Sequence, residues 1–179
     1  MLREIAPVFG HEGTFFRLPT SDDAEAIRRI RNDQTTWENL TDPTPITESD
    51  QVAWYRALSS RAGTRCFVVF DEVNPFLGYV RMDEYDKINR SVRVGLDIAP
   101  EFRGRGHGQK AFSLLLRYAF HEMNVHRVWL LVLHTNLRAI HVYQKIGFSP
   151  EGALREAVFR HGRYVDYKIM SILDKEYSG

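Results

Sequence analysis

A single cysteine, Cys66, is present in the 179 residues of this chain. One thiol cannot form an internal disulfide, and Cys66 lacks the C-x-x-C partner of a structural zinc site. It lies in the apolar run 66–70 with no activating base beside it, so we expect a small core residue rather than an acyl-carrying nucleophile. The histidines lack the spacing of a ligand set, and the sequence therefore predicts no metal site.

Long hydrophobic runs and an excess of one charge are also missing. Apolar runs such as 66–70 and 128–133 are far too short to span a bilayer, and residues 1–10 lack the apolar core of a signal peptide. We therefore expect a cytoplasmic protein with no membrane partner. The 24 basic and 23 acidic residues give a net charge of +1, without the basic excess of nucleic-acid-binding proteins. No nucleic-acid partner is expected.

The chain does contain strand-like and helix-like segments that alternate without repeats or linkers. Its length and its hydrophobic content of 44% suit one core, so residues 1–179 are expected to form a single α/β (α+β) domain. Expected strands are residues 14–18, 66–70, 76–82, 91–98, 128–133, 154–159 and 164–173. Expected helices start at Ser21 and at Thr47, and cover residues 108–122 and 136–146, with a loop over 33–46.

The clearest periodicities lie in residues 91–98 and 108–122. In the first, every second residue is apolar, which is typical of a strand with one buried face. In the second, apolar residues recur with the spacing of an amphipathic helix. The strands up to residue 98 are expected to form an antiparallel meander, and the last two strands a hairpin across His161-Gly162.

The turn between these two segments has the most distinctive chemistry. Glycines alternate with charged or polar residues over residues 103–108, Arg-Gly-Arg-Gly-His-Gly. Glycines let the backbone approach a ligand closely, and the free N–H groups at the start of the next helix point towards one place. The two arginines add positive charge. Such a turn favours the binding of a pyrophosphate.

Three other interpretations of the turn are weaker. The turn lacks the Gly-Lys-Ser/Thr of a P-loop, which disfavours ATP. Residues 106–111 fit the G-x-G-x-x-A form of a dinucleotide-binding turn, but the next strand ends in Leu133-His134 rather than in an acidic residue for a ribose. A flexible strand-to-helix turn remains the plainest alternative for a glycine cluster taken alone.

Two segments resemble the signatures of the Gcn5-related N-acetyltransferase (GNAT) superfamily. Residues 103–108 match its acetyl-CoA signature, R/Q-x-x-G-x-G/A, and residues 136–148 match N-x-x-A-x-x-x-Y-x-x-x-G-F. The elements over residues 14–173 also follow the family's order. The resemblance implies a mixed, mostly antiparallel sheet of about seven strands flanked by about four helices. The sequence looks most like spermidine, ribosomal-protein N-terminal and nucleotide-amino-sugar acetyltransferases.

The resemblance implies an N-acetyltransferase that uses acetyl-CoA as co-substrate. The acetyl group would move to a primary amine by direct transfer in a ternary complex. A polyamine, an amino sugar and a protein N-terminus all remain open as acceptors, and a homodimer is a further expectation from relatives. A non-catalytic CoA-binding or interaction domain is the alternative from another class.

The resemblance also implies roles for individual residues. The strand before the turn would form hydrogen bonds with the pantetheine, and the amides of the turn would bind the pyrophosphate. Asn136 would form a hydrogen bond with the pantetheine arm. The implied cofactor-binding residues are Leu96, Asp97, Ile98, Arg103, Gly104, Arg105, Gly106, His107, Gly108, Gln109, Lys110, Asn136 and Tyr143. Tyr143 matches the tyrosine that protonates the departing thiolate, although a tyrosine on an apolar helical stripe is by itself ordinary core packing.

The general base is less clear from the sequence. Some relatives carry a glutamate at the position of Leu131, so this chain departs from their pattern. Glu84, at the end of a strand beside the expected cleft, is the first candidate for the base, with Asp83 and Asp97 behind it.

Overall fold

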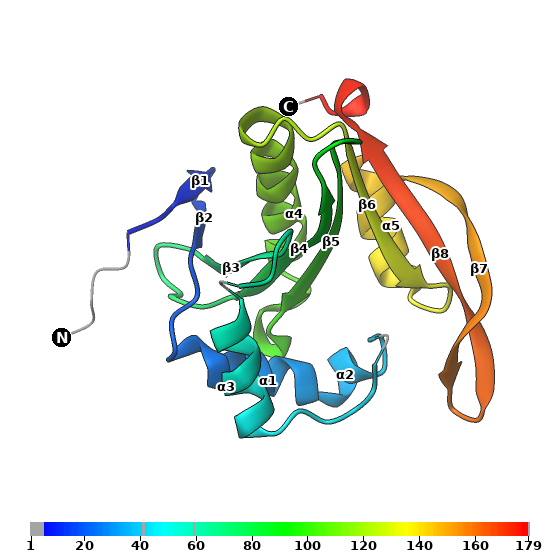
Figure 1. Cartoon of the computed structure of the whole chain (residues 1–179), viewed down its shortest axis with the longest axis horizontal. Helices are drawn as coiled ribbons and strands as arrows, with labels where there is room; N and C mark the ends of the chain where they lie inside the picture. The colour runs from blue at the N-terminus through cyan, green and yellow to red at the C-terminus, as the bar shows by residue number, and fades with distance from the viewer. Residues whose placement is uncertain (1–5, 41, 59, 179) are drawn as a thin grey trace.

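Strands and helices alternate along the computed structural model, which describes residues 6–40, 42–58 and 60–178 (Figure 1). The strands are β1 (Phe9–His11), β2 (Thr14–Arg17), β3 (Arg65–Phe70), β4 (Gly78–Asp86), β5 (Ser91–Ile98), β6 (Arg127–Leu133), β7 (Ser149–Arg160) and β8 (Arg163–Leu173). The helices are α1 (Asp23–Asn32), α2 (Gln34–Trp37), α3 (Glu48–Ala57), α4 (His107–Arg117) and α5 (Leu137–Ile146). Three short helical segments are η1 (Pro100–Phe102), η2 (Tyr118–Glu122) and η3 (Asp174–Glu176).

The described strands form one sheet in the order β1-β2-β3-β4-β5-β6-β8-β7. Strands β5 and β6 run parallel, whereas the other neighbours are antiparallel. The predicted mixed, mostly antiparallel sheet is confirmed, with β1 as one strand more than the seven expected. β1 was missed because it has only three residues, which is too short for a readable alternation.

Two helical segments differ from the prediction. Residues 33–46 were expected to form a loop, but the Asp33 side chain accepts hydrogen bonds from the Thr35 and Thr36 amides and starts the one-turn helix α2. The helix expected over residues 108–122 continues beyond α4 as the π-helical segment η2. None of the described helices combines the length and apolar character that a bilayer crossing requires.

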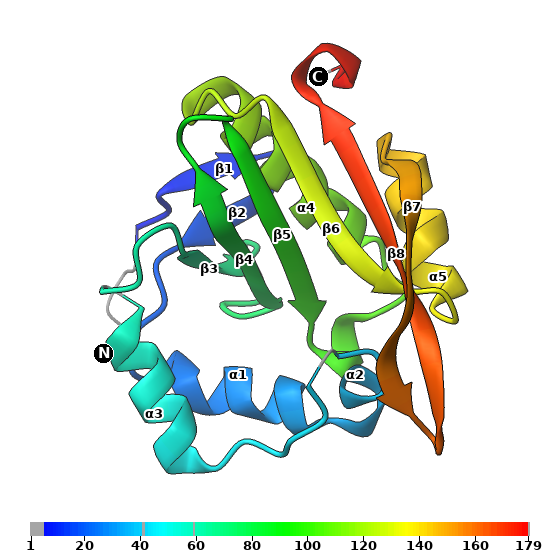
Figure 2. The ribbon, with the colours of Figure 1, turned by 45° about the vertical axis from the view of Figure 1, so that its right-hand side comes forward.

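Both faces of the sheet are covered near its centre, by α4 and α5 on one side and by α1 and α3 on the other (Figure 2). Neighbouring residues of β4 point to opposite faces: Val80 belongs to the core under α4, whereas Tyr79 packs with Ile27 and Ile30 of α1. Cys66 lies in this second core, 5% exposed, and burial raises the pKa of its thiol to about 12. The prediction of a core cysteine is therefore confirmed.

Gly78 allows β4 and β5 to approach each other where β5 ends. Its φ is 155°, and a Cβ built there would lie 2.2 Å from the Asp97 carbonyl oxygen and 2.8 Å from the Ile98 Cα. We expect Gly78→Ala to lower the free energy of unfolding by about 2–3 kcal/mol, because the strands must separate. Urea denaturation followed by circular dichroism measures this loss. Gly152→Ala is the control, since a Cβ there meets nothing within 4 Å, and equal stability of the two variants would contradict the prediction.

Candidate functional site

Strands β5 and β6 pair at their beginnings and then part. Their pairing covers residues 91–93 and 127–129, whereas β5 stays paired with β4, and β6 with β8, to their ends. Within the described chain, the facing edges of residues 94–98 and 130–133 therefore have no strand partner (Figure 2). We call the region between these two segments the splay. Its free backbone N–H and C=O groups can bond an extended ligand, as the edge of any sheet can.

The glycine turn joins the end of β5 to α4 beside the splay. Gly104 and Gly106 have φ values of 81° and 85°, a conformation that glycine adopts without strain. Within α4, the Lys110 amide donates to the Gly106 carbonyl at 3.1 Å, and the amides before Lys110 have no helical acceptor. A Cβ on Gly108 would lie 3.8 Å from Ile98, so the first turn of α4 packs against the end of β5. The open amides suit an anion there.

The Arg103 side chain lies elsewhere than the sequence suggested. Its Nε donates to the Ile98 carbonyl at 2.8 Å, and its Nη1 and Nη2 donate to the hydroxyls of Thr35 and Thr36 on α2. Asp33 lies 3.7 Å from Nη1. The guanidinium thus ties the turn to α2 instead of adding free charge to the anion cradle.

Other cations supply the charge at the turn. Arg105 and Lys110 are exposed. Arg138 of α5 was missed by the sequence analysis, yet a Cβ on Gly104 would lie 3.5 Å from its Nη2. A cation in the first turn of a helix opposes the helix dipole, and this is the sequence signal that could have found it. The remaining expected turn residues, His107 and Gln109, are half-buried.

Asn136 and the end of β5 flank the splay from its two sides. Asn136 follows β6 and caps α5, with its Oδ1 accepting from the Ala139 amide at 3.1 Å. Its side-chain amide nitrogen stays available as a donor. On the other side, Leu96 and Ile98 point towards α4, so Asp97 between them points to the opposite face of the sheet.

Tyr143 lies on α5 and packs against aromatic rings of the main core. Its ring centroid is 5.1 Å from that of Phe112 and 5.9 Å from that of Phe148. Burial, and then the charge of Asp97, raise the pKa of the Tyr143 phenol above its ordinary value. The phenol is therefore protonated at neutral pH and can donate a proton.

Glu84 lies near the turn that joins β4 to β5. We call this the closed end of the two strands, and it is away from the splay. It follows the pair Asp83↔Arg93, whereas the other end of β5 carries Ile98. Its carboxylate is 3.0 Å from Arg93 Nη2, and its side chain is 55% exposed. The structure thus does not place Glu84 beside the splay, although the sequence analysis expected it beside the cleft.

Asp97 is the carboxylate beside the splay. It lies opposite Tyr79 in the register, and its charge, after burial, raises the pKa of the Tyr79 phenol. A Cβ on Gly95 would lie 3.3 Å from Arg81 Nη2, so the missing side chain lets the Arg81 guanidinium lie across β5 on the same face. The charge of Asp97 also raises the pKa of the Tyr143 phenol, so Asp97 of β5 interacts electrostatically with Tyr143 of α5.

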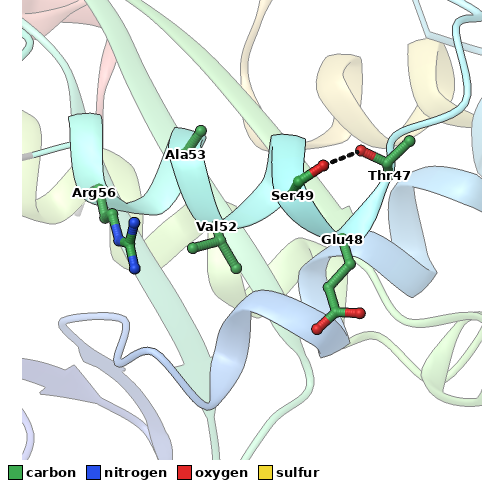
Figure 3. A pocket seen from close by; sticks show the side chains of 6 residues that line it. All are labelled: Thr47, Glu48, Ser49, Val52, Ala53 and Arg56. Carbon is green, nitrogen blue, oxygen red and sulfur yellow. Dashed lines mark hydrogen bonds between the residues drawn. The ribbon is translucent and has the colours of Figure 1, made fainter.

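Two hollows are found on the surface, one along α3 and one at the end of β6. Figure 3 shows a shallow one of about 550 Å³ along α3, lined by Thr47, Glu48, Ser49, Val52, Ala53 and Arg56. None of the catalytic or cofactor-binding residues predicted from the sequence lines it. The second, of about 250 Å³, lies at the end of β6. No group of three potential metal ligands occurs among the described residues.

Comparison with known proteins adds a family and several relatives. The model of the acetyltransferase (GNAT) domain matches residues 14–149. The spermidine N(1)-acetyltransferase of Vibrio cholerae is 39% identical over 113 residues, which is 63% of this chain and 65% of that protein. A putative ribosomal N-acetyltransferase of Bacillus subtilis is 28% identical over 177 residues, 94% of this chain and 96% of that protein.

A solved structure resembles the whole fold. The crystal structure of the Vibrio cholerae spermidine N-acetyltransferase in complex with CoA and spermine superimposes with a TM-score of 0.87 at 30% identity, covering 93% of this chain and 99% of that one. In sequence, the match spans only 54–65% of the length of the curated spermidine acetyltransferases.

Proposed function

The chain belongs to the acetyltransferase (GNAT) family, and on that basis we propose that it is an acetyl-CoA-dependent N-acetyltransferase. The observation that carries the proposal is the splay, with the open amides of the α4 turn at its edge and Tyr143 beside it. The free β5 edge suits the amide-bearing arm of CoA, and the turn with Arg138 suits its pyrophosphate. Direct transfer fits the buried thiol of Cys66, whose raised pKa leaves no thiolate to carry the acetyl group.

Three groups of the chain each carry out one part of the reaction: the Asp97 carboxylate, the amides of the free β5 edge and the Tyr143 phenol. Acetyl-CoA supplies the activated thioester. Asp97 takes a proton from the acceptor ammonium, so that the amine nitrogen can attack the carbonyl carbon. Amides of the free β5 edge donate to the carbonyl oxygen as the new C–N bond forms. Tyr143 donates its proton to the sulfur as the C–S bond breaks, and the nitrogen loses its second proton to the Tyr143 phenolate as the neutral amide forms. We thus propose Asp97 in place of Glu84 as the base.

The acceptor is a primary amine, and the names of the relatives help to narrow the choice among the classes of amine. Polyamines are supported by the Vibrio cholerae relative, which is named for spermidine and was solved with spermine. Protein N-termini are supported by the Bacillus subtilis relative, which is named as a ribosomal acetyltransferase. Amino sugars remain the third class.

A thiol-release assay with acetyl-CoA tests the proposal against panels of polyamines, amino sugars and N-terminal peptides. Turnover on any class supports the enzyme. Calorimetry in parallel separates two failures: binding without turnover favours the non-catalytic CoA-binding domain, and absence of binding overturns the proposal altogether.

A homodimer and a cytoplasmic location complete the proposal. β7 is the outer strand of the sheet, and Leu154, Phe159 and Tyr164 on the hairpin are 43%, 56% and 63% exposed. Large exposed apolar groups beside a long edge strand are typical of an association surface. We expect a dimer by light scattering and a monomer for Phe159→Ser. A monomeric parent chain would contradict this. The cytoplasm is the expected location because the reaction draws on the cell's acetyl-CoA.

A further inference from the structure

The hollow at the end of β6 lies at the same end of the sheet as the splay. It has a volume of about 250 Å³ and is bounded by the segment after α2, the end of β6 and the β7–β8 hairpin. Figure 2 shows these three segments close together at one end of the sheet. Its lining residues are Glu38, Asn39, Leu133, Thr135, Arg160, His161, Arg163 and Val165. The hollow is large enough for a small polar group with bound water.

Arg160 is the buried charge of this hollow, with only 7% of its surface exposed. Its Nη1 donates to the Phe159 carbonyl at 2.7 Å, and its Nη2 donates to the Leu40 carbonyl. Its Nε is buried and finds no hydrogen-bond partner among the described residues. A buried guanidinium with no hydrogen-bonded carboxylate is costly, because both its charge and its donors lose water.

Two carboxylates lie near the hollow, and each accepts a hydrogen bond from a neutral group. Glu38 accepts a hydrogen bond from Gln34 Nε2 at 3.0 Å. Asp42 accepts from the Thr44 amide at 2.8 Å, and hydrogen bonds from Thr44, with weaker effects of Arg31 and Arg160, hold its pKa below the usual range. Asp42 thus acts on both Arg31 and Arg160, and these two carboxylates are outnumbered by Arg31, Arg160 and Arg163.

Further cations face the same region. Arg163 lines the hollow at the hairpin turn and forms no ion pair within the described chain. Arg31 acts on the same carboxyl as Arg160, and its Nε is likewise buried without a partner among the residues described. The region therefore offers more strong donors than acceptors, which is the arrangement that recognises a carboxylate or a phosphate.

We propose that this hollow, through Arg160 and Arg163, binds an anionic group of the acceptor, so that the substrate carries a primary amine and, at its other end, a carboxylate or phosphate. The inference rests on the proposed acetyltransferase function and names the substrate class for that site. A polyamine would meet two arginines there and one carboxylate, that of Glu38.

Matched amines test the inference in the thiol-release assay. Lysine is compared with cadaverine, which lacks the carboxylate, and glucosamine 6-phosphate with glucosamine; spermidine is the polycation. We expect the anionic member of at least one pair to have a kcat/KM about tenfold or more above its partner, as charged hydrogen bonds provide. The pair that responds distinguishes a carboxylate from a phosphate.

Variants assign the preference to the hollow. Arg163→Gln, at an exposed position, should remove most of the preference by raising KM for the amine that carries the anionic group; Arg160→Gln should do so more strongly if it folds. Arg65→Gln, at the exposed first residue of β3, is the matched control. A preference for spermidine, or an anion preference that Arg163→Gln leaves intact, overturns the inference while the acetyltransferase stands.

Calorimetry covers the case in which no amine of the panel is turned over. Inorganic phosphate and malonate are titrated into protein saturated with CoA, which occupies the turn. Binding that Arg163→Gln abolishes supports the inference, and binding that is absent or unaffected overturns it. Failure to bind CoA at all overturns the proposed function, and the inference falls with it.

Discussion

Replacing Tyr143 with phenylalanine is expected to lower kcat by about tenfold or more, with acetyl-CoA affinity unchanged. The variant keeps the ring that packs on Phe112 and Phe148, so the core between α4 and α5 stays filled. It loses only the hydroxyl, whose raised pKa keeps it protonated and able to donate to the departing sulfur. Steady-state kinetics with calorimetric acetyl-CoA titration measure both quantities.

The pH dependence gives a second test of Tyr143. Because burial raises its pKa, the phenol stays protonated through the assay range, and the parent enzyme should show no loss of rate from tyrosine ionisation near neutral pH. Tyr118→Phe is the matched control, since Tyr118 packs against Phe67 at the other end of the α4 core. Full turnover by Tyr143→Phe would refute the assignment.

Replacing Asp97 with asparagine is expected to lower kcat/KM by about a hundredfold at neutral pH. Asparagine keeps the shape of the side chain but cannot accept a proton from the ammonium. An alkyl amine loses its proton unaided near pH 10, so the deficit should shrink as the pH rises. A purely structural role for Asp97 would instead reduce the rate by the same factor at every pH.

Glu84→Gln is the matched comparison for Asp97→Asn. Glu84 is bound to Arg93 at the closed end of β4 and β5, so its removal should change kcat/KM less than about twofold and leave the pH profile intact. The opposite result, a pH-dependent loss for Glu84→Gln and none for Asp97→Asn, would return the base to Glu84. Acetyl-CoA affinity and melting temperature should be close to those of the parent in both variants.

Local sequence determined most of the elements and the composition of the turn. The alternation of apolar residues over 91–98 predicted β5, and Val92 and Val94 are buried on one face of that strand. The stripe over residues 108–122 predicted α4 and η2, which end within the predicted range. Such patterns can be recognised in the sequence because the side chains on one face recur at short intervals, and the interval differs between a strand and a helix. The two signature segments likewise indicated the family, which the domain match to residues 14–149 confirms.

Only the tertiary structure decided which side chains meet. Arg103 was expected at the anion cradle, but the structure directs its guanidinium to α2, a helix that the sequence did not predict. Glu84 and Asp97 both lie on strands of the same sheet. The strand register shows that β6 parts from β5 after residue 93, and this parting distinguishes the open end, with Asp97, from the closed end, with Glu84. Arg138 and Arg160 reach the site from elements distant in sequence.

The reason is physical. Secondary structure follows from interactions between residues a few positions apart, which a sequence displays directly. Strand register, the parting of two strands and the direction of a long side chain depend on packing between segments far apart in the chain, and no short spacing encodes them. The sequence by itself thus determined the fold class and indicated a candidate anion-binding turn, whereas the proposals of Asp97 as the base and of the basic hollow came from the folded chain.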